Sequence, residues 1–259
     1  KCQNPFGNHN MVVHEWGDKK NTSVLLCLHG LTRSAKDFYF FARSLKKYFR
    51  VLAPDLVGRG ESDWLENENL FQISQYINDI NSMLIQLNIK RINFIGTSLG
   101  GLVGLLMASK IFDKNLNSFP FILADSSQVL ANSDVCFDSL VINDFPASIS
   151  VNSLFDLAEQ IKYDANQIFS SFSQAEEYVK KISTEFGFHT DLQWKILTES
   201  YVKLSEESGT YKIHYDPKIV SQFKLYELMF RNDSNFGLFR MPDLNFWEFY
   251  DKIKCSTLL

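Results

Sequence analysis

One serine in this chain has the surroundings that nucleophilic chemistry requires. Ser98 is the central residue of the segment GTSLG at 96–100, with a short apolar strand pattern before it and an apolar helix pattern after it. Gly96 and Gly100 allow the backbone to turn sharply between the two elements, because glycine tolerates positive φ and close approach of the chain. A turn of this kind exposes the serine hydroxyl above the end of the strand. Ser98 is therefore the predicted nucleophile.

The elements before Ser98 alternate between strand and helix. An edge strand is predicted at 11–17, and the continuous apolar run at 23–28 is typical of a strand that is buried on both faces of a parallel sheet. Apolar spacing predicts helices over 38–45 and 72–87, with a short strand at 51–53 between them. This order predicts a parallel sheet with right-handed crossovers.

Beyond Pro146 the sequence changes to helical patterns. The segments that begin at Ser173 and Thr190 both match a capping box, and only 210–214 has the pattern of a strand. The tail at 255–259 has the pattern of a strand that is just beginning. We therefore predict three parts: the amino-terminal part of an α/β core at 11–146, a helical lid or cap at 147–240, and a return to the core at 241–259.

Composition limits the partners. The 259 residues carry a net charge of -4, which argues against nucleic acid or an anionic membrane surface as a partner. There is no apolar run of membrane-spanning length and no secretory leader pattern, so a cytoplasmic location is expected. The four cysteines lack metal-ligand spacing, and no phosphate loop is present. We expect a small-molecule substrate, no metal and no cofactor.

Four segments in order resemble the α/β-hydrolase superfamily. They are HGLTRS at 29–34, DLVGRGESD at 55–63, GTSLGG at 96–101, and the stretch from LYELMF at 225–230 to the terminal IKCSTLL at 253–259. The resemblance implies a mostly parallel sheet flanked by helices, with a helical lid inserted. It also implies a serine that attacks a carbonyl, a histidine that takes its proton, and a carboxylate that orients the histidine.

The resemblance assigns roles to several further residues. The backbone N–H groups of Leu31 and Leu99 would form the oxyanion hole, and His29 with Gly30 would shape the loop that carries Leu31. His29 is expected to be structural rather than the general base. Asp55 is expected to hold the loop at 55–63.

Two arginines could touch an anionic substrate. Arg33 and Arg59 lie in the HGLTRS and DLVGRGESD segments, so both could lie near a bound ligand. Salt bridges are the expected role of both.

The chain also departs from the pattern of these hydrolases. It ends before the loops that usually supply the acid and the histidine, so the last strands and the last helix are expected to be missing. Asp144 follows a strand pattern at 139–142, where some members carry an alternative acid, and 113–138 is expected to be an insertion.

Two function hypotheses follow from these observations. The first is a serine hydrolase that acts on a small apolar ester, amide or carbon–carbon bonded ketone. The second is a truncated, inactive remnant or a ligand-binding protein that lacks the acid and the histidine.

Overall fold

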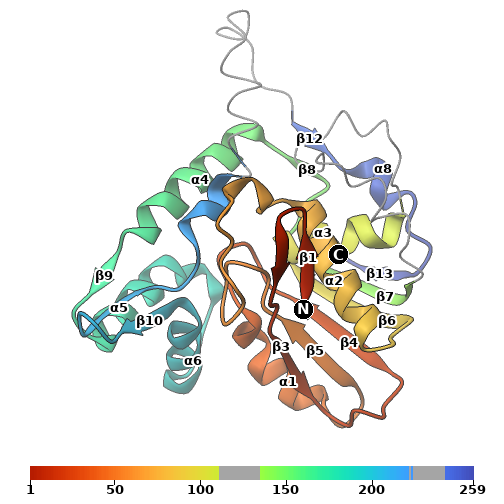
Figure 1. The fold of residues 1–259 in the computed structure, drawn as a ribbon, viewed down its shortest axis with the longest axis horizontal. Coiled ribbons are helices and arrows are strands. Elements are labelled where there is room, and N and C mark those ends of the chain that lie inside the picture. Colours follow the sequence, from red (N-terminus) through yellow and green to blue (C-terminus); the bar gives the residue numbers. More distant parts are fainter. Residues whose placement is uncertain (111–134, 222, 224–242) are drawn as a thin grey trace, which may run out of the picture.

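A six-stranded sheet forms the centre of the core, seen at the right of Figure 1. The computed structural model describes residues 1–110, 135–221, 223 and 243–259. Only β3 runs antiparallel to its neighbour, β5, and the other four pairings are parallel, which confirms the predicted α/β-hydrolase architecture. From edge to edge the strands are β13 (Ser256–Leu258), β7 (Cys136–Asn143), β6 (Arg91–Thr97), β4 (Val24–Leu28), β5 (Arg50–Pro54) and β3 (Val13–Trp16).

Helices cover both faces of this sheet. All five residues of β4 are buried, and successive side chains of a strand point to opposite faces. Leu25 and Cys27 pack with the apolar residues of η1 (Ala35–Phe38) and α1 (Tyr39–Leu45). Leu26 and Leu28 join the larger cluster that includes α2 (Ile73–Gln86) and α3 (Leu99–Ser109). Burial on both faces explains why β4 is a continuous apolar run.

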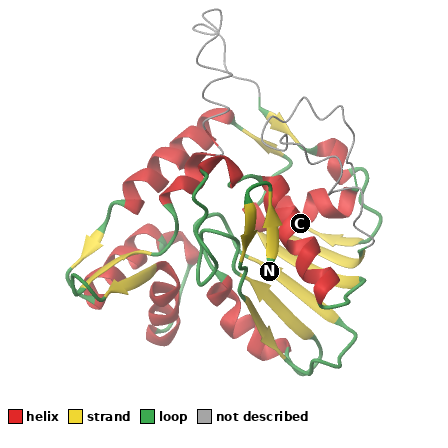
Figure 2. Ribbon diagram, viewed as in Figure 1, coloured by secondary structure: helices red, strands yellow, loops and turns green. Residues whose placement is uncertain are grey.

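Residues 151–220, which belong to the segment predicted as a lid or cap and are called the cap below, contain helices and a small sheet at the left of Figure 2. The strand predicted at 210–214 is present, but two further strands of the cap sheet pair around it. β9 has two residues and β10 has four, which is too short for a period-two pattern to stand out, and this is why the sequence did not reveal them. The elements are α4 (Val151–Ala165), β9 (Ile168–Phe169), α5 (Phe172–Ile182), η6 (Thr184–Phe186), α6 (Asp191–Tyr201), β10 (Val202–Ser205), β11 (Thr210–Ile213) and η7 (Pro217–Val220).

The two predicted capping boxes have different outcomes. Thr190 caps α6, and Gln193 completes the box, as predicted. The helix α5 begins earlier than predicted, because Ser171 is its cap and accepts a hydrogen bond from the Gln174 backbone N–H. Ser171 with Gln174 and Ser173 with Glu176 both have the three-residue spacing of a capping box, so spacing alone could not show which serine begins the helix.

The remaining elements lie at the edges of the core. A hairpin of β1 (Cys2–Asn4) and β2 (Gly7–His9), which the sequence did not predict, lies against α2. Most of the predicted insertion at 113–138, and the LYELMF segment, lie outside the described residues. The other elements are η2 (Glu68–Leu70), β8 (Ser148–Ile149), β12 (Leu244–Asn245) and α8 (Trp247–Tyr250).

Candidate active site

Ser98 has a strained backbone at the junction of β6 and α3. Its φ is 51° and its ψ is -113°, a positive φ that residues other than glycine seldom adopt. The Ser98 N–H donates to the carbonyl of Asn143 at 2.8 Å, which ties the turn to the end of β7. The side chain is half-buried, and its hydroxyl has no hydrogen-bond partner among the described residues. Strain of this kind is typical of functional sites.

The two glycines that flank Ser98 are required by close packing. A Cβ on Gly96 would lie 2.2 Å from the backbone of Gly100, and a Cβ on Gly100 would lie 2.1 Å from the carbonyl oxygen of Leu28. Both contacts are with backbone atoms, which cannot move without displacing a strand. The sharp turn therefore depends on the absence of side chains at these two positions.

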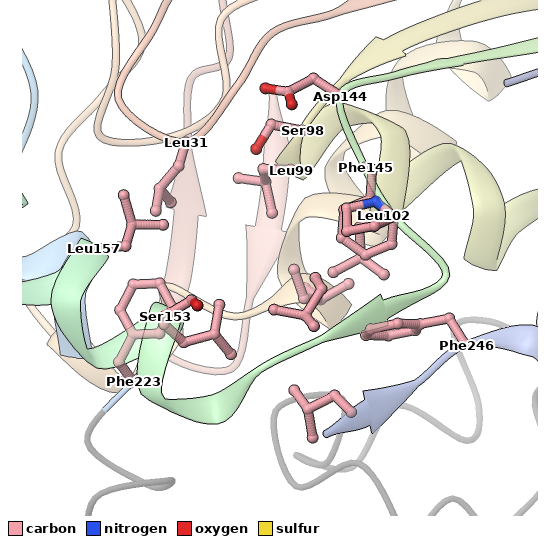
Figure 3. A pocket seen from close by; sticks show the side chains of 15 residues that line it. Leu31, Ser98, Leu99, Leu102, Asp144, Phe145, Ser153, Leu157, Phe223 and Phe246 are labelled. Carbon is pink, nitrogen blue, oxygen red and sulfur yellow. The ribbon is translucent and has the colours of Figure 1, made fainter. Parts of the chain in front are cut away.

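Ser98 lies at one end of a mostly apolar cavity of about 240 Å³ (Figure 3). Core and cap both supply its walls: Leu102 comes from α3, Leu157 from α4, and Phe246 from the return to the core. Among the described lining residues, the polar side chains are those of Ser98, Asp144 and Ser153. The complete described lining is Leu31, Ile73, Ser98, Leu99, Leu102, Asp144, Phe145, Pro146, Ile149, Ser153, Leu154, Leu157, Phe223, Leu244 and Phe246.

Leu31 and Leu99 border the same end of the cavity as Ser98 (Figure 3). Leu99 is the first residue of α3, where backbone N–H groups have no partner within the helix. The Leu31 N–H has no hydrogen-bond partner in the described part of the chain. Two free donors beside a serine are suited to stabilise a developing oxyanion.

Asp144 follows β7 and lines the cavity together with Ser98. Its φ of 56° turns the chain away from the strand, and its side chain is exposed. Figure 3 shows the carboxylate at the Ser98 end of the cavity. Among the described lining residues, Asp144 is the one ionisable side chain.

His29 is buried beside the site, but both ring nitrogens are engaged. Nδ1 lies 2.7 Å from the carbonyl oxygen of Gly30, and Nε2 accepts from the backbone N–H of Leu56 at 3.0 Å. Burial lowers the pKa of His29, so the ring is neutral with its proton on Nδ1. The other four histidines also lie in the described part of the chain, and no histidine lines the cavity that holds Ser98.

Asp55 holds the loop that follows β5, as predicted. Its carboxylate accepts from the backbone N–H groups of Ala35 at 2.7 Å and Glu61 at 3.0 Å, and it lies 3.2 Å from His14 Nε2. Its carbonyl oxygen accepts from the hydroxyl of Ser62. Burial would raise the pKa of Asp55, but the hydrogen bonds from His14 and from the two backbone N–H groups outweigh it and lower the pKa.

The two arginines of the signature segments have different partners. Arg33 makes the expected salt bridge, a two-point contact with Asp37, and also reaches Ser200 of the cap. The prediction of a salt bridge for Arg59 is wrong, because no carboxylate of the described chain lies within 4 Å of its guanidinium nitrogens. Arg59 instead donates to the carbonyl oxygen of Leu31 at 2.7 Å. Sequence spacing gave no sign of this contact, which joins residues 28 positions apart.

A buried cluster at the amino terminus brings together ligand types that sequence spacing did not connect. The side chains of Cys2, His9 and Asp79 place their ligand atoms within 4.8 Å of one another, and all three atom types bind zinc in proteins. In this structure hydrogen bonds occupy them. The amide N–H of Asn4 donates to His9 Nδ1 while its Oδ1 accepts from Phe6, so the proton of His9 lies on Nε2 and donates to Asp79 at 2.9 Å. The cluster therefore joins the hairpin to α2 by hydrogen bonds.

Comparison with known proteins agrees with this architecture. A family profile for the alpha/beta hydrolase fold matches residues 23–146. The 3-hydroxybutyrate-oligomer hydrolase of Cupriavidus necator is 31% identical over 226 residues, which are 86% of this chain and 69% of that protein.

Solved structures show the same likeness. A Rickettsia typhi protein assigned as a hydrolase superimposes with a TM-score of 0.74 at 28% identity, covering 96% of this chain and 72% of that one. An alpha/beta hydrolase from Novosphingobium aromaticivorans gives 0.67 at 25% identity, covering 96% and 75%. Among the described helices, none has the length and hydropathy to cross a membrane. The chain is therefore a hydrolase of the α/β-hydrolase fold family.

Proposed function

We propose that the protein is a serine hydrolase that cleaves small apolar esters, with Ser98 as nucleophile. The observation that carries the proposal is the strained turn at Ser98, which opens into the apolar cavity between Leu31 and Leu99. An unengaged hydroxyl beside two free backbone donors supports acyl transfer. The apolar walls support an uncharged acyl group as the occupant.

Similarity to a named relative favours an ester over an amide or a ketone. The relative from Cupriavidus necator is a 3-hydroxybutyrate-oligomer hydrolase, and such oligomers are joined by ester bonds. The described lining of the cavity contains no lysine, arginine or histidine that could bind a free carboxylate. We therefore propose that an ester-linked, uncharged unit enters the cavity, and that any carboxylate of the substrate stays outside it.

The proposed reaction begins with attack of Ser98 Oγ on the ester carbonyl carbon. The carbonyl oxygen becomes an oxyanion facing the N–H groups of Leu31 and Leu99 as Ser98 Oγ gives up its proton. Collapse of this intermediate breaks the ester C–O bond, and the alcohol leaves with that proton. Water then attacks the acyl-serine, its hydroxyl group becomes part of the released acid, and its other proton returns to Ser98 Oγ. Asp144 is the candidate acid of the site, and no histidine lines the cavity in the described chain to connect it with Ser98.

Active-site labelling tests the proposal. A fluorophosphonate probe is expected to label the protein once per chain, and Ser98→Ala is expected to abolish the labelling and to lower ester hydrolysis by about 10³-fold or more. Ser153→Ala is the matched control, because Ser153 lines the same cavity on α4 and has no proposed role in the chemistry. Labelling that persists in Ser98→Ala would overturn the assignment.

A ligand-binding protein is the second candidate function. It is favoured by one observation, that no histidine lines the cavity in the described chain. On this hypothesis p-nitrophenyl butyrate would bind and remain uncleaved, and the probe would not react with Ser98. Measuring turnover and labelling on the same preparation separates the two functions.

A further inference from the structure

Arg59 is a fully buried cation without a carboxylate at salt-bridge distance among the described residues. Its exposed fraction is 0%, and no Asp or Glu of the described chain lies within 4 Å of its guanidinium. Burial of a charge is costly unless neighbouring groups satisfy its hydrogen bonds. The guanidinium is held by two backbone carbonyls and one tyrosine instead of by an anion.

The contacts of Arg59 fix its orientation. Nη1 donates to the carbonyl oxygen of Val57 at 2.7 Å and to the hydroxyl of Tyr76 at 2.9 Å. The guanidinium carbon lies 4.9 Å from the centroid of the Tyr76 ring, and Nη2 has no hydrogen-bond partner. Nε is thereby directed at the carbonyl oxygen of Leu31, 2.7 Å away. Tyr76 belongs to α2, so the arginine ties the Leu31 loop to a core helix.

Leu31 is the residue whose N–H is proposed to bind the oxyanion. A loop N–H can serve this purpose only if its direction is fixed before the reaction, because a donor that must reorient gains little in the transition state. The bond from Arg59 holds the carbonyl of the same residue, and so restricts rotation of the backbone on both sides of it.

We propose that Arg59 is a positioning residue of the oxyanion hole, which holds the Leu31 N–H in place through its hydrogen bond to the Leu31 carbonyl. The inference rests on the proposed serine hydrolase function. It predicts that the loss of Arg59 weakens the transition state more than the binding of the substrate.

The test compares variants by turnover per active site, with active sites counted by fluorophosphonate titration. In Arg59→Met, kcat for p-nitrophenyl butyrate is expected to fall about 100-fold while KM changes less than about threefold. Affinity for an alkyl trifluoromethyl ketone, which forms a tetrahedral oxyanion adduct, should fall by a similar factor. Affinity for the corresponding ester analogue, which cannot form such an adduct, should stay unchanged.

Arg50→Met is the matched control. Arg50 is also a largely buried arginine, but it lies on β5 and donates to Glu15, so kcat per active site should stay within about threefold of the wild type. Arg59→Lys keeps the charge and replaces Arg59→Met if that variant does not fold; its kcat should fall at least tenfold, because an ammonium lacks the planar donor set.

The outcomes separate the two proposals. A wild-type protein that labels at Ser98, together with Arg59 variants whose kcat per active site and ketone affinity match the wild type, would overturn the inference alone. A wild-type protein that neither labels nor turns over ester would overturn both. A fall in thermal stability with unchanged kcat per active site would reduce Arg59 to a purely structural residue.

Discussion

Asp55 and Ser98 occupy equivalent places in the sheet, since each is the first residue after a parallel strand. Asp55 is 1% exposed, and its carboxylate already accepts two backbone hydrogen bonds and contacts His14. Ser98 is half-buried, and its hydroxyl has no partner in the described chain. A polar side chain at the end of a strand is free for chemistry only where the structure has not already used its hydrogen-bonding capacity.

The largest expected effect tests the packing beneath the serine. Gly100→Ala should lower the free energy of unfolding by about 3 kcal/mol or more, because its Cβ would lie 2.1 Å from the Leu28 carbonyl oxygen. Thermal unfolding should show a drop in Tm on the order of 10 °C. Gly30→Ala is the control, since its Cβ would make ordinary contacts of 3.6 Å or more. Equal losses in both variants would contradict the packing argument.

Substitution of Asp55 should affect stability, whereas substitution of Asp144 should affect the labelling of Ser98. Asp55→Ala should lower the free energy of unfolding by about 2 to 3 kcal/mol, because it leaves the buried N–H of Ala35 unpaired. Asp144→Ala, at the equivalent position after β7, should change stability by less than about 0.5 kcal/mol, since the side chain is exposed.

Labelling should show the opposite order for these two variants. Asp144→Ala is expected to slow fluorophosphonate labelling of Ser98, and Asp55→Ala is expected to preserve it per folded molecule. Urea denaturation and labelling time courses measure the two properties. If Asp144→Ala costs as much stability as Asp55→Ala, the distinction between engaged and free carboxylates fails.

The smallest expected effect is the change with pH in the free energy of unfolding that His14 contributes. Its hydrogen bond to Asp55 raises the pKa of His14 above its ordinary value of 6.5, against the opposing effect of burial. The folded state therefore binds this proton more tightly than the unfolded state. The stabilisation is fully present below pH 6.5 and is lost as the pH rises through the raised pKa. The wild type should exceed His14→Gln by up to about 1 kcal/mol at pH 6 and by less at pH 9.

His214 supplies the control of opposite sign. Burial, together with nearby Lys203, lowers its pKa, so its contribution is lost as the pH falls below 6.5. The difference between wild type and His214→Gln should therefore shrink on acidification. Thermal unfolding between pH 5 and 9 measures both variants, and a His14→Gln difference that grows with pH would contradict the assigned direction.

Local features of the sequence determined the frame of the site. The apolar run of β4, the helical spacing of α2 and the glycines around Ser98 act over a few residues, so their patterns predicted the parallel sheet and the turn. The role of Asp55 in holding its loop was expected from the resemblance of the DLVGRGESD segment to α/β-hydrolases, and its two backbone hydrogen bonds agree with that expectation.

Only the tertiary structure decided which polar groups remain free and what surrounds Ser98. The cavity draws Leu157 and Phe246 from distant parts of the chain, and the bond from Arg59 to Leu31 crosses between two loops. The same holds for the contact of His9 with Asp79, 70 residues away. Such contacts depend on how the elements pack, and neither periodicity nor motif spacing carries that information. The sequence therefore predicted Ser98 as the nucleophile, and the fold determined that its hydroxyl has no partner in the described chain and that Arg59 donates to the carbonyl of Leu31 beside it.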